Sequence, residues 1–139
     1  MRELNKIIIH CSDTYSRMDV GVKEIDKWHK DRGFSEIGYH FVIKRDGTTE
    51  RGRDIEKIGA HCKEQNNDSI GICVIGGKSE MGTPEDNFAF RQIVATRNLI
   101  TYLRLIFPKI KEISPHSEYS NYKTCPNFDI YDRLDIEKQ

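Results

Sequence analysis

Residues 69–77 read SIGICVIGG, and this stretch decides the fold class. Its first seven residues are mostly apolar and uncharged, and the pair Gly76 and Gly77 follows them. A short apolar run that ends at turn residues is typical of a strand buried in a parallel or mixed sheet. We therefore predict a buried central strand here, and the other elements are placed outward from it.

Three more strands are expected around this one. Residues 6–10 (KIIIH) form a second short apolar run, and residues 39–44 (YHFVIK) form a third. The Asp-Gly pair within residues 45–48 predicts a hairpin turn, after which residues 49–51 return as a strand. The polar residues 13–19 are interpreted as a loop.

Helical spacing predicts a helix over residues 22–32, which Gly33 ends. The longest helix is expected to begin with Thr83 as its cap and Pro84 in its first position, and Pro108 is expected to stop it. Its predicted apolar face consists of Phe90, Ile93, Leu99, Ile100, Leu103, Ile106 and Phe107.

A short strand near residues 111–114 and a short helix after Asp129 complete the chain. Because strands and helices alternate, we predict an α/β or α+β fold, with a central mixed sheet flanked by helices. The 139 residues suit one domain, and we expect residues 1–139 to form it.

Composition excludes several classes of function. Lys plus Arg equals Asp plus Glu at 22 each, so the zero net charge argues against a nucleic-acid partner. No apolar run approaches the roughly 18 residues of a membrane helix, and the N-terminus does not resemble a signal peptide. We therefore expect a protein made in the cytosol, outside the membrane. Its four cysteines contain no CxxC pair and are expected to be free thiols or metal ligands.

Two histidines and a cysteine are candidate metal ligands. His10 ends the first apolar strand, while His116 and Cys125 lie nine residues apart in one predicted loop. Three protein ligands of this kind would leave a fourth tetrahedral position for water, as in catalytic zinc sites, and a thiolate favours zinc over magnesium or calcium. The spacing alone is not specific, and a surface histidine with a buried cysteine explains it equally well.

Two further side chains are candidates for stabilising an oxyanion. Tyr39 enters a predicted strand, where its hydroxyl is able to donate a hydrogen bond, although most tyrosines there serve packing. Lys123 lies two residues before Cys125 and would supply a full charge, although most lysines are simply solvated.

Taken together and in order with several short sequence blocks, these features match one family from about residue 6 to residue 133. The blocks are IIHCS at 8–12, GVKEI at 21–25, WHK at 28–30, GYHFVIKRDG at 38–47, GAH at 59–61, NDSIGI at 67–72 and KTCPNFD at 123–129. With these blocks the chain resembles the zinc-dependent N-acetylmuramoyl-L-alanine amidases of the phage-lysozyme type, which share their fold with the peptidoglycan recognition proteins.

The resemblance implies one zinc ion per chain, held by His10, His116 and Cys125, and catalytic roles for Tyr39 and Lys123. It places His61 in the substrate cleft. The implied reaction is hydrolysis of the amide between N-acetylmuramic acid and L-alanine in peptidoglycan, by water that zinc activates. The loop between His116 and Cys125 is one residue longer than is usual in the family.

Other functions remain open from the sequence. The chain could bind peptidoglycan without cleaving it, although the presence of Cys125 argues against this. Some phage amidases of this type also bind and inhibit an RNA polymerase, and a metallohydrolase with another substrate is a more distant alternative. We expect a monomer that reaches the cell wall after lysis or assisted release.

Overall fold

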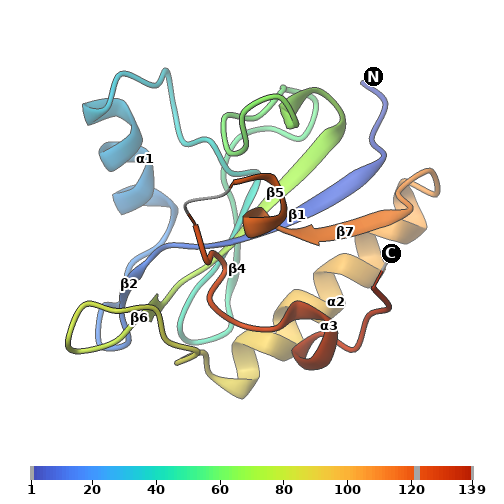
Figure 1. The fold of residues 1–139 in the computed structure, drawn as a ribbon. Helices are drawn as coiled ribbons and strands as arrows, with labels where there is room; N and C mark the ends of the chain where they lie inside the picture. The colour runs from blue at the N-terminus through green and yellow to red at the C-terminus, as the bar shows by residue number, and fades with distance from the viewer. Residues whose placement is uncertain (1, 121–122, 139) are drawn as a thin grey trace.

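The computed structural model describes residues 2–120 and 123–138, and its main sheet has five strands in the order β4-β3-β5-β1-β7 (Figure 1). These strands are β1 (Lys6–Cys11), β3 (Phe41–Ile43), β4 (Thr49–Arg51), β5 (Ser69–Val74) and β7 (Glu112–Pro115). Strand β1 runs parallel to β5 and β7, β3 runs parallel to β5, and β4 is antiparallel at the edge. The predicted mixed sheet is confirmed.

The centre of the sheet is buried on both faces. Every residue of β5 is buried, and the isoleucines at positions 7, 8 and 9 of β1 are fully inaccessible. Burying one such side chain contributes roughly 1.5–3 kcal/mol, so these two strands anchor the domain. Because side chains alternate along a strand, Ile7 and Ile9 face one side of the sheet, whereas Ile8 and His10 face the other.

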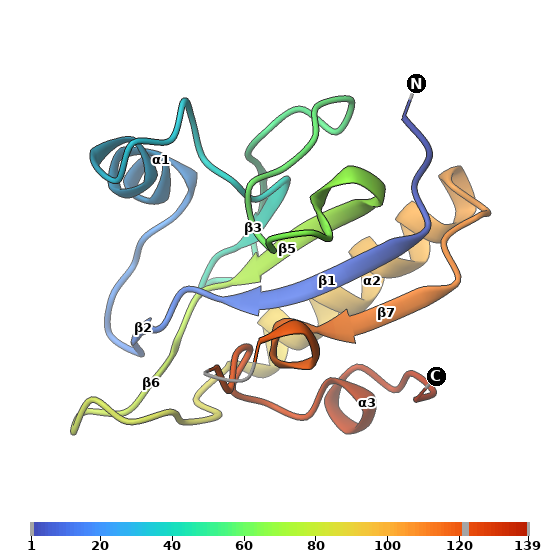
Figure 2. The ribbon, with the colours of Figure 1, turned by 45° about the horizontal axis from the view of Figure 1, so that its top comes forward.

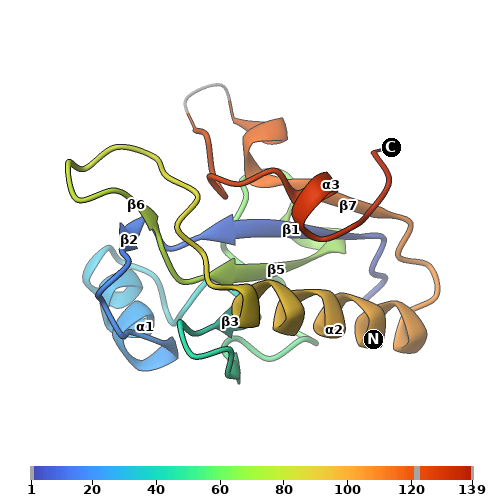
Figure 3. The ribbon, with the colours of Figure 1, turned by 90° about the horizontal axis from the view of Figure 1, so that it is seen from below.

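Helices cover both faces. The long helix α2 (Phe90–Ile106) runs along the face that carries Ile7 and Ile9, and the short α3 (Ile130–Arg133) packs into the same core (Figure 3). Helix α1 (Val22–Asp31) lies on the other side, beyond β3 (Figure 2), where Ile25 joins a second, smaller core. The α1 prediction is confirmed to within one residue, and Asp129 caps α3 through its side chain.

The predicted start of α2 is wrong. The helix begins at Phe90, because Thr83 is used in a loop instead of as a cap. The hydroxyls of Ser79 and Thr83 lie 2.7 Å apart, and the Ser79 N–H donates to the Thr83 carbonyl at 2.7 Å. At the true start, the N–H of Ala89 donates to Oε1 of Gln92 at 2.9 Å.

The predicted apolar face of α2 is correct except at Phe90 and Ile106, and Phe107, directly after the helix, also packs against the core. Ile93, Leu99, Ile100 and Leu103 are buried, but Phe90 is 76% exposed and Ile106 is 47% exposed.

Smaller elements complete the fold. The predicted loop 13–19 contains β2 (Thr14–Tyr15), which pairs with β6 (Gly77–Lys78) in a separate two-stranded sheet. One-turn helices η1 (Asn66–Asp68) and η2 (His116–Tyr119) precede β5 and follow β7. The Asp-Gly hairpin is confirmed, with Gly47 at a φ of +90°. None of the helices within the described residues is long and apolar enough to cross a membrane.

Candidate metal centre and its cleft

Three potential ligands converge where β1 and β7 end. Strand register pairs Ile9 with Pro115, so the residues that follow them, His10 in β1 and His116 at the start of η2, lie side by side. Their ring centroids are 4.4 Å apart. Cys125 joins them from the following loop, and one donor atom from each of the three residues lies within 4.8 Å of the others. The structure thus brings together the three ligands that the resemblance implied.

The two histidines are held in the neutral form that metal binding needs. Burial is the main cause that lowers the pKa of His10 well below its ordinary value, and the neighbouring charges of His61, His116 and Lys123 act in the same direction. The pKa of His116 is also lowered, by burial and then by Lys123. A neutral imidazole has a free lone pair, which is the form that coordinates a metal ion.

The sulfur of Cys125 has its own hydrogen-bond donor. The backbone N–H of Cys11 donates to Sγ of Cys125 at 3.1 Å. Backbone donors of this kind commonly support a metal-binding side chain from outside the ligand set. A hydrogen bond with Cys125 and then burial raise the pKa of the Cys11 thiol, so Cys11 stays protonated beside it. The donor set therefore fits zinc, which prefers nitrogen and sulfur ligands.

A chain of hydrogen bonds runs behind His10. Its Nε2 lies 2.9 Å from Nδ1 of His61, and Nε2 of His61 lies 3.1 Å from Oγ of Ser69. The Ser69 hydroxyl in turn donates to the carbonyl of Gln65 at 2.7 Å. His61 is only 9% exposed, and its pKa is lowered to about 3, chiefly by burial.

Tyr39 lies beside His10, one of the candidate ligands. Its ring centroid is 5.0 Å from that of His10. Burial is the first cause that raises the pKa of Tyr39 well above its ordinary value, and the nearby thiols of Cys73, Cys125 and Cys11 add to it. The hydroxyl therefore keeps its proton and is available as a donor. Cys73 is fully buried as expected, and a hydrogen bond with Tyr39 partly offsets the raised pKa of its thiol.

Two hollows meet at this centre, and four residues line both of them: Arg32, Tyr39, His116 and Lys123. The first has a volume of about 590 Å³ and the second of about 460 Å³. The first also contains His61 and Lys63, while Cys125 lines the second. Together they form one cleft that passes over the ligand set.

The remaining two histidines hold backbone in place. Nδ1 of His29 accepts the N–H of Gly38 at 2.9 Å, and Nδ1 of His40 accepts the N–H of Gly71 at 3.1 Å. Nε2 of His40 also lies 2.9 Å from the carbonyl of Lys57. These hydrogen bonds give both histidines a structural role.

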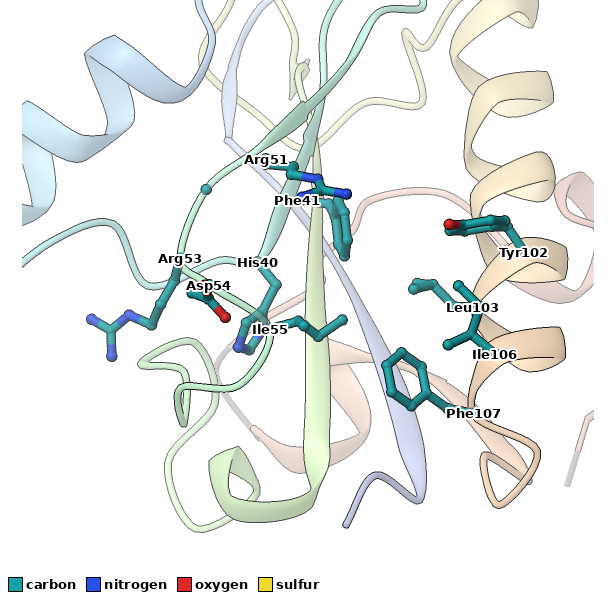
Figure 4. Close-up of a pocket in the computed structure, with 11 residues that line it drawn as sticks. His40, Phe41, Arg51, Arg53, Asp54, Ile55, Tyr102, Leu103, Ile106 and Phe107 are labelled. Carbon is teal, nitrogen blue, oxygen red and sulfur yellow. The ribbon is translucent and has the colours of Figure 1, made fainter. Parts of the chain in front are cut away.

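A third hollow lies away from the metal centre, between α2 and the segment around β3 and β4 (Figure 4). Its volume is about 360 Å³, and Phe41, Leu103 and Phe107 contribute an apolar lining. The guanidinium of Arg53, which also lines this hollow, donates to the backbone carbonyls of Glu36, Ile37 and Ile58. His40, which also lines this hollow, is engaged by backbone groups as well.

Sequence reasoning missed three contributors to the site. The supporting contacts of Cys11 and Ser69 depend on which residues become neighbours across strands, and no local pattern indicates this. Arg32 follows directly after α1 and borders both hollows. The longer loop expected between His116 and Cys125 falls in part on residues 121 and 122, which lie outside the described residues.

Comparison with known proteins agrees with this geometry. The N-acetylmuramoyl-L-alanine amidase family matches residues 1–128. An endolysin of Enterobacteria phage K11 is 43% identical over 129 residues, covering 93% of this chain and 84% of the relative. The endolysin of Escherichia phage T7 is 42% identical over 124 residues, covering 89% and 81%.

Solved structures show the same fold. The N-acetylmuramoyl-L-alanine amidase LysC from Clostridium intestinale superposes with a TM-score of 0.79 at 30% identity, covering 98% of this chain and 88% of that one. Wild-type Drosophila PGRP-LB superposes with a TM-score of 0.74 at 26% identity, covering 91% and 76%.

The chain therefore belongs to the N-acetylmuramoyl-L-alanine amidase family. Its class is that of a peptidoglycan amidase, and within that class its relatives include phage endolysins. The family resemblance and the fold predicted from the sequence blocks are both confirmed.

Proposed function

We propose that this protein is a zinc-dependent amidase that cleaves the bond between N-acetylmuramic acid and L-alanine in peptidoglycan. The observation that carries the proposal is the convergence of His10, His116 and Cys125 at the meeting point of two hollows. Zinc held by two histidines and a cysteine activates water and polarises a carbonyl group. One ion per chain is expected.

Residues beside the ligand set would handle the charge that develops on the attacked carbonyl. Tyr39 keeps its hydroxyl proton, and Lys123 carries a positive charge at the border of both hollows. Donors aimed at a developing oxyanion stabilise the transition state more than the ground state. We assign Tyr39 and Lys123 to this role.

The charge of the cleft suits the substrate. Arg32, Lys63 and Lys123 line the first hollow, and its described lining includes no acidic residue. The stem peptide of peptidoglycan carries free carboxylates, which such a surface attracts. We therefore place the stem peptide in the first hollow and the muramic acid in the second. His61 borders the first hollow, so a contact with substrate remains part of the proposal.

Digestion of purified sacculi tests the proposal. New alanine amino termini and new reducing sugar ends are followed separately, with chelator, with added zinc, and with neither. We expect alanine termini alone, abolished by chelator and restored by zinc. Reducing ends would identify a glycosidase and refute the mechanism. Binding to sacculi without any product, from folded and zinc-loaded protein, would establish the non-catalytic binder instead.

Two cysteine variants sharpen this test. Cys125→Ala removes a proposed ligand, whereas Cys62→Ala removes a thiol in the wall of the first hollow, outside the ligand set. Zinc binding should be lost in the first and retained in the second. The RNA polymerase partner and the monomeric state follow only from the family resemblance. A polymerase pull-down and a measurement of mass in solution test them.

A further inference from the structure

We propose that His61 is a positioning residue of the metal centre: its Nδ1 accepts a hydrogen bond from Nε2 of His10 and so leaves Nδ1 of His10 free to bind the metal. This inference deepens the proposed function and rests on it, because it requires His10 to be a ligand. It gives His61 a role that differs from a contact with substrate.

The direction of each hydrogen bond follows from counting protons. A carbonyl only accepts, so the single hydroxyl proton of Ser69 is donated to Gln65 at 2.7 Å. Oγ of Ser69 must then accept from His61 across 3.1 Å, which places the proton of His61 on Nε2. The ring of His61 is buried and its hydrogen-bond partners are His10 and Ser69, neither of which is a carboxylate, so the ring carries a single proton and its Nδ1 bears a lone pair.

The same count continues to His10. Nε2 of His10 lies 2.9 Å from the lone pair of His61, so Nε2 carries the proton and donates it. A neutral His10 then has its lone pair on Nδ1. The backbone carbonyl of Gln65 thus sets the tautomer of His10 through Ser69 and His61. Metal-binding histidines commonly use their second nitrogen in this way.

The ring of His61 has little freedom to turn. A Cβ atom added at Gly71 would lie 2.5 Å from its Cγ, and one added at Gly59 would lie 2.7 Å from its Cδ2. The backbone N–H of His61 also donates to Oδ1 of Asn66 at 3.0 Å. Two glycines therefore clamp the ring, and an amide fixes the backbone that carries it. Such rigidity is what a group that orients a ligand requires.

Two amide variants of His61 separate its role in orienting His10 from its role in packing. In His61→Asn the amide oxygen is bonded to Cγ, as Nδ1 is in histidine, so the acceptor for His10 is kept. In His61→Gln the amide lies farther out, near the original Nε2, so the contact with Ser69 is favoured and the acceptor is lost. Zinc affinity is measured for the full chain by competition with a chromogenic chelator, and metal-free unfolding temperatures monitor folding.

We expect His61→Gln to weaken zinc binding about 10- to 100-fold and His61→Asn by less than about threefold. Catalytic efficiency of the Gln variant should recover when zinc is in excess, which a purely structural defect would not show. Equal affinity of wild type and the Gln variant, or equal losses in both variants, would overturn the inference. If the Gln variant fails to fold, Ser69→Ala is used in its place, because this change removes the hydrogen bond from Ser69 to the His61 ring and keeps the ring itself. Unchanged zinc affinity in Ser69→Ala would also overturn the inference.

The inference and the proposed function fail in different ways. If the wild-type protein binds no zinc, both the proposed function and the inference are refuted. If the wild-type protein binds zinc and cleaves peptidoglycan, and the two His61 variants bind zinc with equal affinity, only the inference is refuted.

Discussion

Replacing Gly71 by alanine should damage the metal centre without touching any ligand. The new Cβ would lie 2.5, 2.6 and 2.8 Å from three ring atoms of His61. Relaxed contacts between carbon atoms are about 3.5 Å or longer, so one side must move by about 1 Å. The backbone of Gly71 is held by two hydrogen bonds to His40, of 2.9 and 3.1 Å, and by pairing with Ile8. The ring of His61 is therefore expected to move.

This displacement has two measurable consequences. Overpacking of a well-filled core typically costs about 1–3 kcal/mol, which for a domain of this size lowers the melting temperature by about 3–12 °C. Shifting His61 also breaks its 2.9 Å contact with His10, so zinc affinity should fall about 10- to 100-fold. Thermal unfolding without metal and a chelator competition assay measure the two effects separately.

Gly33→Ala is the control for Gly71→Ala. Gly33 has a φ of +98° and open space where its Cβ would lie. Alanine there should cost about 1–2 kcal/mol through backbone strain and leave zinc affinity unchanged. The reasoning is refuted if Gly71→Ala keeps both its melting temperature and its zinc affinity. It is also refuted if both variants lose zinc affinity equally.

Three further predictions concern the site and its surroundings. Cys125→Ala should lose tight zinc binding and lytic activity, as the chelator assay and sacculus digestion would show; retention of both would contradict the ligand assignment. Tyr39→Phe should lower kcat by about 100- to 1,000-fold, while the exposed Tyr102→Phe should not; equal kcat values in steady-state assays would remove Tyr39 from catalysis. Burial lowers the pKa of His40 to about 4, so the unfolded chain binds more protons than the folded one below pH 6.5, and stability without metal should fall on acidification. The loss attributable to His40 approaches about 3 kcal/mol near pH 4, and urea unfolding at pH 7 and pH 5 would reveal it; equal values at the two pH values would contradict it.

Local patterns were sufficient for much of the fold. The apolar runs around Ile8 and Ile72 predicted the two central strands, and the Asp-Gly turn at Gly47 predicted the hairpin. These features depend on near neighbours in the chain, such as side-chain alternation and turn geometry. The start of α2 was misplaced because Thr83 is an equally good cap and loop residue. Whether Thr83 acts as a cap or as a loop residue depends on its hydrogen bond with Ser79, which forms only once the chain has folded.

The sequence by itself determined which chemistry this protein carries, because ordered blocks around His10, Tyr39, His116 and Cys125 resemble one family and supply nitrogen and sulfur donors. It did not determine how these groups are supported. Only the tertiary structure decided that Cys11 donates to Cys125 and that His61 stands behind His10. The physical reason is that hydrogen bonds between residues 51 to 114 positions apart arise from strand register and packing, which no short stretch of sequence encodes.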